Sequence, residues 1–158
     1  MKLTLIYLKG QSSDWAEAGC SEFVKKISLM TPFEEMAIKA PSRDRGQAAE
    51  KKEAEGEALL KKLDKPGDKL ILFDEKGRAF ESSRKFSEYL VKKIGSGSGR
   101  LVFAIGGPYG FSDAVRQRAE ESVMLSTLTM NHHVARIMAL EQLYRAISIS
   151  KNLPYHND

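Results

Sequence analysis

Two loops, each following an apolar run, carry the residue types best suited to binding a small molecule. The first, at residues 106–110, reads GGPYG, and its adjacent glycines let the backbone approach a ligand with its N–H and C=O groups uncovered. The second spans residues 126–131 and offers hydroxyl and amide side chains. Such loops can bind the hydrogen-bonding edge of a ligand, or they can merely join a strand to a helix. Both interpretations stay open at this point.

The glycine spacing narrows the class of ligand. Gly106, Gly107 and Gly110 do not form the G-x-G-x-x-G fingerprint of dinucleotide-binding proteins, and no Gly-Lys-Ser/Thr sequence marks a phosphate-binding P-loop. A nucleoside with little phosphate therefore suits this loop better than ATP or NAD.

The three histidines of the chain do not indicate a metal site. His132 and His133 are adjacent, so they point to different faces of a helix, and no clustered cysteine or carboxylate accompanies them or His156. We therefore expect no metal cofactor. A serine hydrolase is also disfavoured, because the sequence lacks a Gly-x-Ser-x-Gly elbow with a matching base.

Two arginines and the final residues are the remaining candidates for chemistry. Arg136 and Arg145 lie among apolar positions of an expected helix, where each can contact phosphate or simply be solvated. The segment Pro154-Tyr155-His156 places a tyrosine and a histidine near the end of the chain. Chain ends usually fray, so disorder is the alternative to a role in binding.

The elements that must position these residues alternate between strands and helices. Apolar runs predict strands at 2–8, 33–38, 69–73, 101–105 and 123–125. Amphipathic patterns predict helices at 14–27, 47–63, 82–94, 112–121 and 131–148. This alternation predicts an α/β fold with a mainly parallel sheet. Ligands of such sheets bind beyond the carboxyl ends of the strands, which selects the loops at 74–77, 106–110 and 126–131.

Composition sets the broad class. A length of 158 residues predicts one domain over residues 1–158, and 42% apolar with 29% charged residues is typical of a soluble protein. No apolar run approaches the roughly 18 residues of a membrane span, so no membrane partner is expected. The single Cys20 cannot form an internal disulfide, which favours the cytoplasm. A net charge of +4 is compatible with a polyanion partner without requiring one.

Several motifs resemble the RlmH (YbeA-like) family of the SPOUT superfamily. They are IGGPYG at 105–110, STLTMNHHVAR at 126–136, LEQLYRAISI at 140–149 and PYH at 154–156. Upstream matches include Asp14-Trp15, Pro32-Phe33-Glu34, Glu55-Gly56-Glu57 and Phe73 with the residues that follow it.

The resemblance implies a fold and an activity that no periodicity argument supplies. It implies helices on both faces of the sheet and a C-terminal trefoil knot over about residues 70–158, although knots are rare in proteins. It also implies a homodimer that uses S-adenosyl-L-methionine to methylate N3 of pseudouridine 1915 in helix 69 of 23S rRNA, on the assembled ribosome. Two alternatives stay open: a SPOUT methyltransferase acting on another RNA, and a non-catalytic protein that binds ribosomes or RNA.

The resemblance also assigns roles to residues. It implies that the cofactor is bound by Phe73, Gly106, Gly107, Leu125, Ser126, Thr127, Leu128, Thr129, Met130 and Asn131. It implies a catalytic role for Tyr155 and His156 with Arg145 in support, and RNA contacts for Arg136 and His132. Tyr155 or His156 would act as the base, or as an orienting group, when the imide N3–H loses its proton.

Two positions depart from the family's pattern. The family usually has proline where this chain has Asn131, and a basic residue where it has Asn157. We therefore expect the end of the cofactor loop to differ from the family's, and no phosphate contact from a basic residue directly after the PYH motif.

Overall fold

The computed structural model describes residues 1–39 and 47–157. The domain predicted over residues 1–158 thus includes two stretches, 40–46 and 158, that lie outside the described residues. Within the described part, five parallel strands form one sheet in the order β2-β1-β4-β3-β5. The strands are β1 (Lys2–Leu8), β2 (Phe33–Ile38), β3 (Lys69–Arg78), β4 (Arg100–Ile105) and β5 (Glu121–Val123). The predicted parallel α/β architecture is confirmed.

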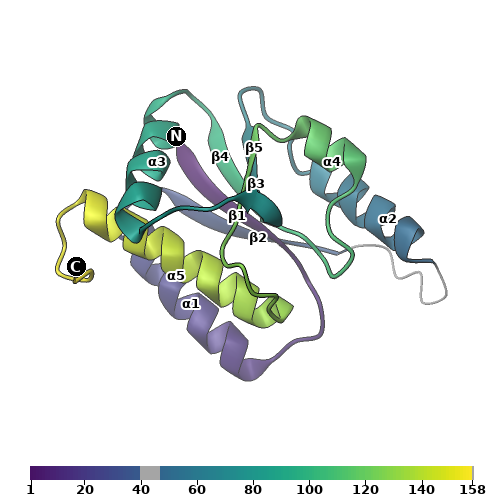
Figure 1. The fold of residues 1–158 in the computed structure, drawn as a ribbon, viewed down its shortest axis with the longest axis horizontal. Coiled ribbons are helices and arrows are strands. Elements are labelled where there is room, and N and C mark those ends of the chain that lie inside the picture. Colours follow the sequence, from purple (N-terminus) through teal and green to yellow (C-terminus); the bar gives the residue numbers. More distant parts are fainter. Residues whose placement is uncertain (40–46, 158) are drawn as a thin grey trace.

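Helices cover both faces of this sheet (Figure 1). One face is covered by α1 (Asp14–Ser28), α3 (Ser83–Gly95) and α5 (His132–Ser150). The other face is covered by α2 (Ala48–Leu60) and α4 (Asp113–Arg118). Successive side chains of a strand point to opposite faces, and β4 follows this rule: Leu101 and Phe103 join the first core, whereas Val102 and Ala104 join the second.

The central strand β4 explains why the sequence shows a continuous apolar run near residue 101. Every residue from Arg100 to Ile105 is buried, because β4 lies between two strands and under helices on both sides. A strand covered on both faces gains from apolar side chains at every position. Arg100 is the one charged residue of β4, and its guanidinium donates a hydrogen bond to the buried Asp68 carboxylate.

The loop predicted at residues 74–77 is wrong. Strand β3 continues through these residues to Arg78, and both Phe73 and Arg78 pair with Val123 of β5 across an irregular register. Gly77 makes this close passage feasible, since a Cβ at that position would lie 2.5 Å from the backbone of Val123. The apolar run predicted the end of β3 at Phe73, but the strand continues through polar residues to Arg78.

The helix expected at 112–121 is shorter than predicted. It runs from Asp113 to Arg118, and the Ser112 hydroxyl caps it by accepting a hydrogen bond from the Val115 amide. Residues from Glu121 onward pair with β3 as strand β5 instead. None of the helices in the described part of the chain has the length and apolar character that crossing a membrane requires.

Candidate functional site

Three predicted cofactor segments lie side by side on neighbouring strands. Phe73 of β3 pairs with Ile105 of β4 on one side and with Val123 of β5 on the other. Gly106 directly follows Ile105, and Leu125 lies two residues beyond Val123. Because the strands are parallel, Gly106 and Leu125 leave the sheet at its carboxyl edge beside Phe73, where ligands of open α/β sheets bind.

Phe73 belongs to the floor of this region. Its side chain is buried and stacks on Phe103, with 5.0 Å between the ring centroids. The ring therefore supports the sheet edge from below. Because its side chain is buried, Phe73 can contact a ligand only through its backbone N–H and C=O groups.

The loop at residues 126–131 is held at both ends by its own side chains. The Ser126 hydroxyl accepts a hydrogen bond from the Leu128 amide, at 3.0 Å. The Asn131 side-chain oxygen Oδ1 accepts one from the His133 amide, at 2.8 Å, and caps α5. Asparagine is among the preferred helix caps, so Asn131 closes this loop where the family usually has proline. Thr127, Leu128 and Thr129 between them are exposed.

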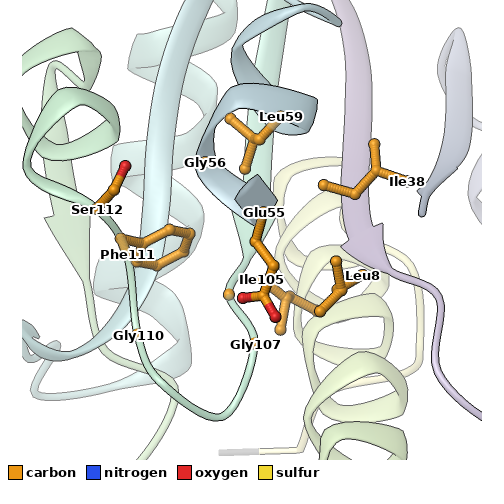
Figure 2. Close-up of a pocket in the computed structure, with 11 residues that line it drawn as sticks. Leu8, Ile38, Glu55, Gly56, Leu59, Ile105, Gly107, Gly110, Phe111 and Ser112 are labelled. Atoms are coloured by element: carbon orange, nitrogen blue, oxygen red, sulfur yellow. The ribbon is translucent and has the colours of Figure 1, made fainter. Parts of the chain in front are cut away.

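The glycine loop needs its glycines for two separate reasons. Gly110 has a φ of 78°, in the left-handed region, and its amide donates a hydrogen bond to the Gly107 carbonyl oxygen. Gly107 has a different constraint, because a Cβ there would overlap the Glu55 carboxylate. Figure 2 shows the Glu55 side chain reaching from α2 towards this loop. The loop is therefore fitted against a helix from the other half of the chain.

The sequence pattern does not predict Glu55 as a site residue. Its Oε2 atom is buried and has no hydrogen-bond partner among the described residues. Burial raises the pKa of Glu55 above its usual value. The pocket between Glu55 and the glycine loop (Figure 2) measures only about 10 Å³, about the size that holds one water molecule. This pocket is too small for a cofactor.

A larger cavity of about 250 Å³ lies at the carboxyl ends of β1 and β4. Its lining comes from the segment after β1, the glycine loop after β4, and the first turns of α1 and α5. The lining residues are Tyr7, Leu8, Lys9, Gly10, Gln11, Ser12, Glu17, Ile105, Gly106, Gly107, Pro108, His132, His133 and Arg136. It shares Gly106 and Gly107 with the predicted cofactor segments, but Phe73 and residues 125–131 do not line it.

Arg136 forms one wall of this cavity and is almost fully enclosed. Its Nε donates to Glu35 at 2.6 Å, its Nη1 donates to Glu17 at 2.7 Å, and its guanidinium lies 3.8 Å from the centroid of the Tyr7 ring. The hydrogen bond from Arg136 lowers the pKa of Glu17. The structure thus directs the donors of Arg136 to two carboxylates, whereas the resemblance implies an RNA contact for this residue.

His132 packs against Gly10 in the cavity wall. A Cβ at Gly10 would lie 3.0 Å from the His132 Nε2 atom, and the His132 and His133 rings are 4.0 Å apart between centroids. Burial, with a smaller effect of His133, lowers the pKa of His132. The imidazole is therefore neutral at neutral pH.

The C-terminal tail packs against the last turns of α5. The Tyr155 hydroxyl donates to Glu141 at 3.0 Å, and the Arg145 Nε donates to the same carboxylate at 3.0 Å. The Arg145 Nη1 lies 3.3 Å from His156 Nδ1, and the Tyr155 ring meets the edge of the Tyr144 ring. The structure thus brings Tyr155, His156 and Arg145 together around Glu141. The Glu141–Arg145 spacing of four residues on a helix was the sequence signal for this carboxylate.

One chain does not bring its tail to its own cofactor segments. His132 begins α5 beside the glycine loop, and the tail lies at the opposite end of this 19-residue helix (Figure 1). At the usual rise of an α-helix, the two ends are about 27 Å apart. Among residues 1–39 and 47–157, no group of three or more histidine, cysteine, aspartate or glutamate side chains is arranged to hold a metal ion.

Comparisons with known proteins give consistent matches. A family model described as "Predicted SPOUT methyltransferase" matches residues 1–156. Curated relatives named "Ribosomal RNA large subunit methyltransferase H" include one from Cytophaga hutchinsonii, 40% identical, covering 99% of this chain and 100% of the relative. Another, from Parabacteroides distasonis, is 41% identical, with full coverage of both chains.

A solved structure supports the fold alone. It is described as a probable methylase family protein from Haemophilus influenzae Rd KW20 and superposes with a TM-score of 0.54 at 12% sequence identity. The match covers 95% of this chain and 66% of that chain. The likeness therefore extends to the arrangement of strands and helices.

Proposed function

The chain belongs to the SPOUT methyltransferase family, and from that membership we propose that it is an S-adenosyl-L-methionine-dependent methyltransferase of large-subunit ribosomal RNA. The family match and the relatives named for this activity confirm the resemblance read from the motifs. One structural observation carries the proposal: the strand register aligns Phe73 with Ile105 and Val123, directly before the segments that hold Gly106 and Leu125. We take residues 1–158 as one domain, with a knotted cofactor-binding part at about 70–158.

The proposed product is N3-methylpseudouridine at position 1915, in helix 69 of 23S rRNA, formed on the assembled ribosome. The full-length match to relatives named for large-subunit rRNA supports this substrate over another RNA. The proposed cellular location is the cytoplasm, where ribosomes are found.

The cofactor would be held by Phe73, Gly106, Gly107, Leu125 and residues 126–131. When bound, it supplies a methyl group carried on a sulfonium. The uncovered backbone at the glycines and the exposed loop at 127–129 offer hydrogen-bonding groups to a nucleoside. The family's proline is replaced by Asn131, and its helix-capping bond keeps the end of the loop fixed.

A homodimer is part of the proposal. Tyr155 and His156 pack on Glu141 and Arg145, about 14 to 20 Å along α5 from His132 at the usual rise of a helix. A second copy with α5 running in the opposite direction would therefore supply the tail to each site. The exposed apolar side chains Trp15 on α1 and Val134 on α5 support a contact on this face.

The contacts of the tail favour an orienting role over that of a base. Burial and the hydrogen bond to Glu141 raise the pKa of Tyr155, so its hydroxyl stays protonated and donates its proton to Glu141. Arginine has no acceptor, so the bond between Arg145 and His156 makes the Nδ1 atom of His156 the acceptor. Transfer from a sulfonium depends chiefly on alignment of the reacting atoms, which these fixed rings can supply.

The test is to incubate the protein and labelled cofactor with ribosomes that lack the modification, with naked rRNA and with tRNA. We expect label at a single pseudouridine of helix 69, on intact ribosomes only. Label on another RNA would support the first alternative. Ribosome binding without measurable cofactor binding in calorimetry would support a non-catalytic binding protein.

A further inference from the structure

The cavity between β1 and β4 lies at the switch point of the sheet. The chain leaves β1 to form α1 on one face and leaves β4 to form α4 on the other, which opens a crevice between the two strand ends. This is the 250 Å³ cavity. The cavity shares Gly106 and Gly107 with the segments assigned to the cofactor, so a ligand here would lie next to the methyl donor.

We propose that this cavity receives the target nucleobase, extruded from the RNA. The inference rests on the proposed function and adds to it the place where the uracil-type base is held. Enzymes that act on a base within folded RNA must bring it into a pocket that fits it closely. Ligand pockets for larger molecules span roughly 300–1,000 Å³, so a cavity of about 250 Å³ suits one base better than a whole cofactor.

The lining has the chemistry that a base requires. Flat rings of His132, His133 and Tyr7 surround the cavity, and proteins recognise unstacked RNA bases by stacking them on such rings. Gly10 and Gly106 line the cavity without side chains of their own. The imide edge of a uracil-type base places one N–H between two carbonyl oxygens, which backbone C=O and N–H groups can match.

The charges of the lining exclude a phosphate as the occupant. Arg136 contributes the buried positive charge, but the carboxylates of Glu17 and Glu35 neutralise it through hydrogen bonds of 2.6 to 2.7 Å. The lowered pKa of His132 keeps that ring neutral. Lys9 is exposed at the rim, where it can meet the RNA backbone. This distribution of charge suits a neutral base within the cavity and an RNA phosphate beside Lys9 at its rim.

Gly10 offers a direct way to close the cavity. A Cβ at Gly10 would lie 3.0 Å from His132 Nε2, so a side chain there would press on the His132 ring at the cavity wall. Its φ is outside the left-handed region, so a side chain is not strained by the backbone. We expect Gly10→Val to fill the space and Gly10→Ala to fill it in part. The matched control is Gly95→Val, because a Cβ at Gly95 has nothing within 4 Å.

The experiment measures kcat/KM on ribosomes lacking the modification, together with the Kd for S-adenosyl-L-methionine and the melting temperature. For Gly10→Val we expect kcat/KM to fall by roughly a hundredfold, the loss typical of a misplaced reacting group, with the Kd and melting temperature of wild type. Gly10→Ala should lose less, and Gly95→Val should match wild type. If Gly10→Val melts early, Gly10→Ala decides alone.

Two results would overturn the inference. In the first, Gly10→Val turns over ribosomes like wild type. In the second, it loses cofactor affinity in step with activity, which would make the cavity part of the cofactor site. If wild type methylates no ribosomes, the proposed function fails separately. Titration with pseudouridine, followed by the NMR signals of His132 and His133, then decides: shifts in wild type that Gly10→Val abolishes support the inference, and no shifts overturn it.

Discussion

The Tyr155 hydroxyl donates a hydrogen bond of 3.0 Å to the Glu141 carboxylate, and this bond ties the tail to helix α5. Arg145 donates to the same carboxylate and lies over the Tyr155 ring, 4.7 Å from its centroid. A tail that would fray by itself is therefore held in one orientation. If this orientation serves the reaction, the tail's contacts should matter for turnover more than for folding.

Tyr155→Phe removes only the hydroxyl and keeps the ring packed on Tyr144. We expect turnover on saturating ribosomes to fall by about tenfold or more, within the range of a lost orienting contact, with unchanged cofactor affinity. Glu141→Gln should act in the same direction, because it weakens the bonds to Tyr155 and Arg145. Single-turnover methylation measures both. Wild-type turnover in Tyr155→Phe and His156→Ala alike would show that the tail takes no part.

Mixed dimers test whether the tail acts on the other subunit. Tyr155→Phe disables the tail and Gly107→Leu disables the glycine loop, so each homodimer should be weak. If tails are exchanged between subunits, a mixed dimer contains one intact site and one site that carries both changes. Equal mixing makes about half of the dimers mixed, so about a quarter of wild-type activity should be recovered. Recovery is measured after co-refolding. No recovery would mean that each tail serves its own chain.

Arg136→Met should destabilise the fold. The substitution leaves two carboxylates without their partner, and the Glu35 side chain is only 12% exposed. Removing one partner of a buried ion pair costs roughly 3–5 kcal/mol. The half-exposed Glu17 adds little, so we expect the lower end of that range. Urea unfolding at fixed protein concentration measures the change. Adding Glu35→Gln to Arg136→Met should recover part of it, and no recovery would contradict the ion-pair explanation.

Gly107→Ala should be destabilising because of Glu55. The new Cβ would overlap the Glu55 carboxylate, and overpacking of this kind costs roughly 1–3 kcal/mol. Glu55→Ala in the same chain removes the overlap and should restore most of the loss. Leu8 also comes within 2.9 Å of the added Cβ, so recovery is expected to be incomplete. Gly95→Ala is the control for replacing a glycine. Additive effects of Gly107→Ala and Glu55→Ala in thermal unfolding would contradict this account.

The ion pair between Asp68 and Arg100 should make the stability of the fold decrease at acid pH. Burial acts to raise the pKa of Asp68, but hydrogen bonds from Arg100 and the Lys65 amide outweigh it and hold the pKa below its usual value of 3.8. A carboxyl with a depressed folded-state pKa stabilises the fold above the unfolded value, and this contribution is lost as the pH falls through the lower folded value.

The corresponding measurement is the free energy of unfolding from pH 7 to pH 2. We expect the contribution of Asp68 to be constant above about pH 5 and to decline below 3.8. Asp68→Asn should lower stability at pH 7, since the side chain is fully buried beside Arg100. It should also flatten the decline at acid pH. An unchanged acid profile in Asp68→Asn would show that other carboxyls determine it.

Apolar patterning was enough to locate the sheet. The continuous run at 101–105 predicted the central strand, and the structure buries every residue of it. The same approach ended β3 at Phe73, because residues 74–78 are polar and join the sheet only through their pairing with β5. Periodicity reports the burial of a segment, whereas residues 74–77 lie in the irregularity between the Phe73 and Arg78 pairs and outside the core.

By itself, the sequence determined the strand and helix order, the family, and the segments assigned to the cofactor, because these depend on local patterns and contiguous motifs. The tertiary structure decided which distant groups meet. Arg136 finds Glu35 and Glu17 across 101 and 119 residues of chain, and Gly107 must be glycine because Glu55 of α2 occupies the space beside it. Such contacts arise only when the chain folds, since sequence spacing carries no information on which faces of remote elements will lie together.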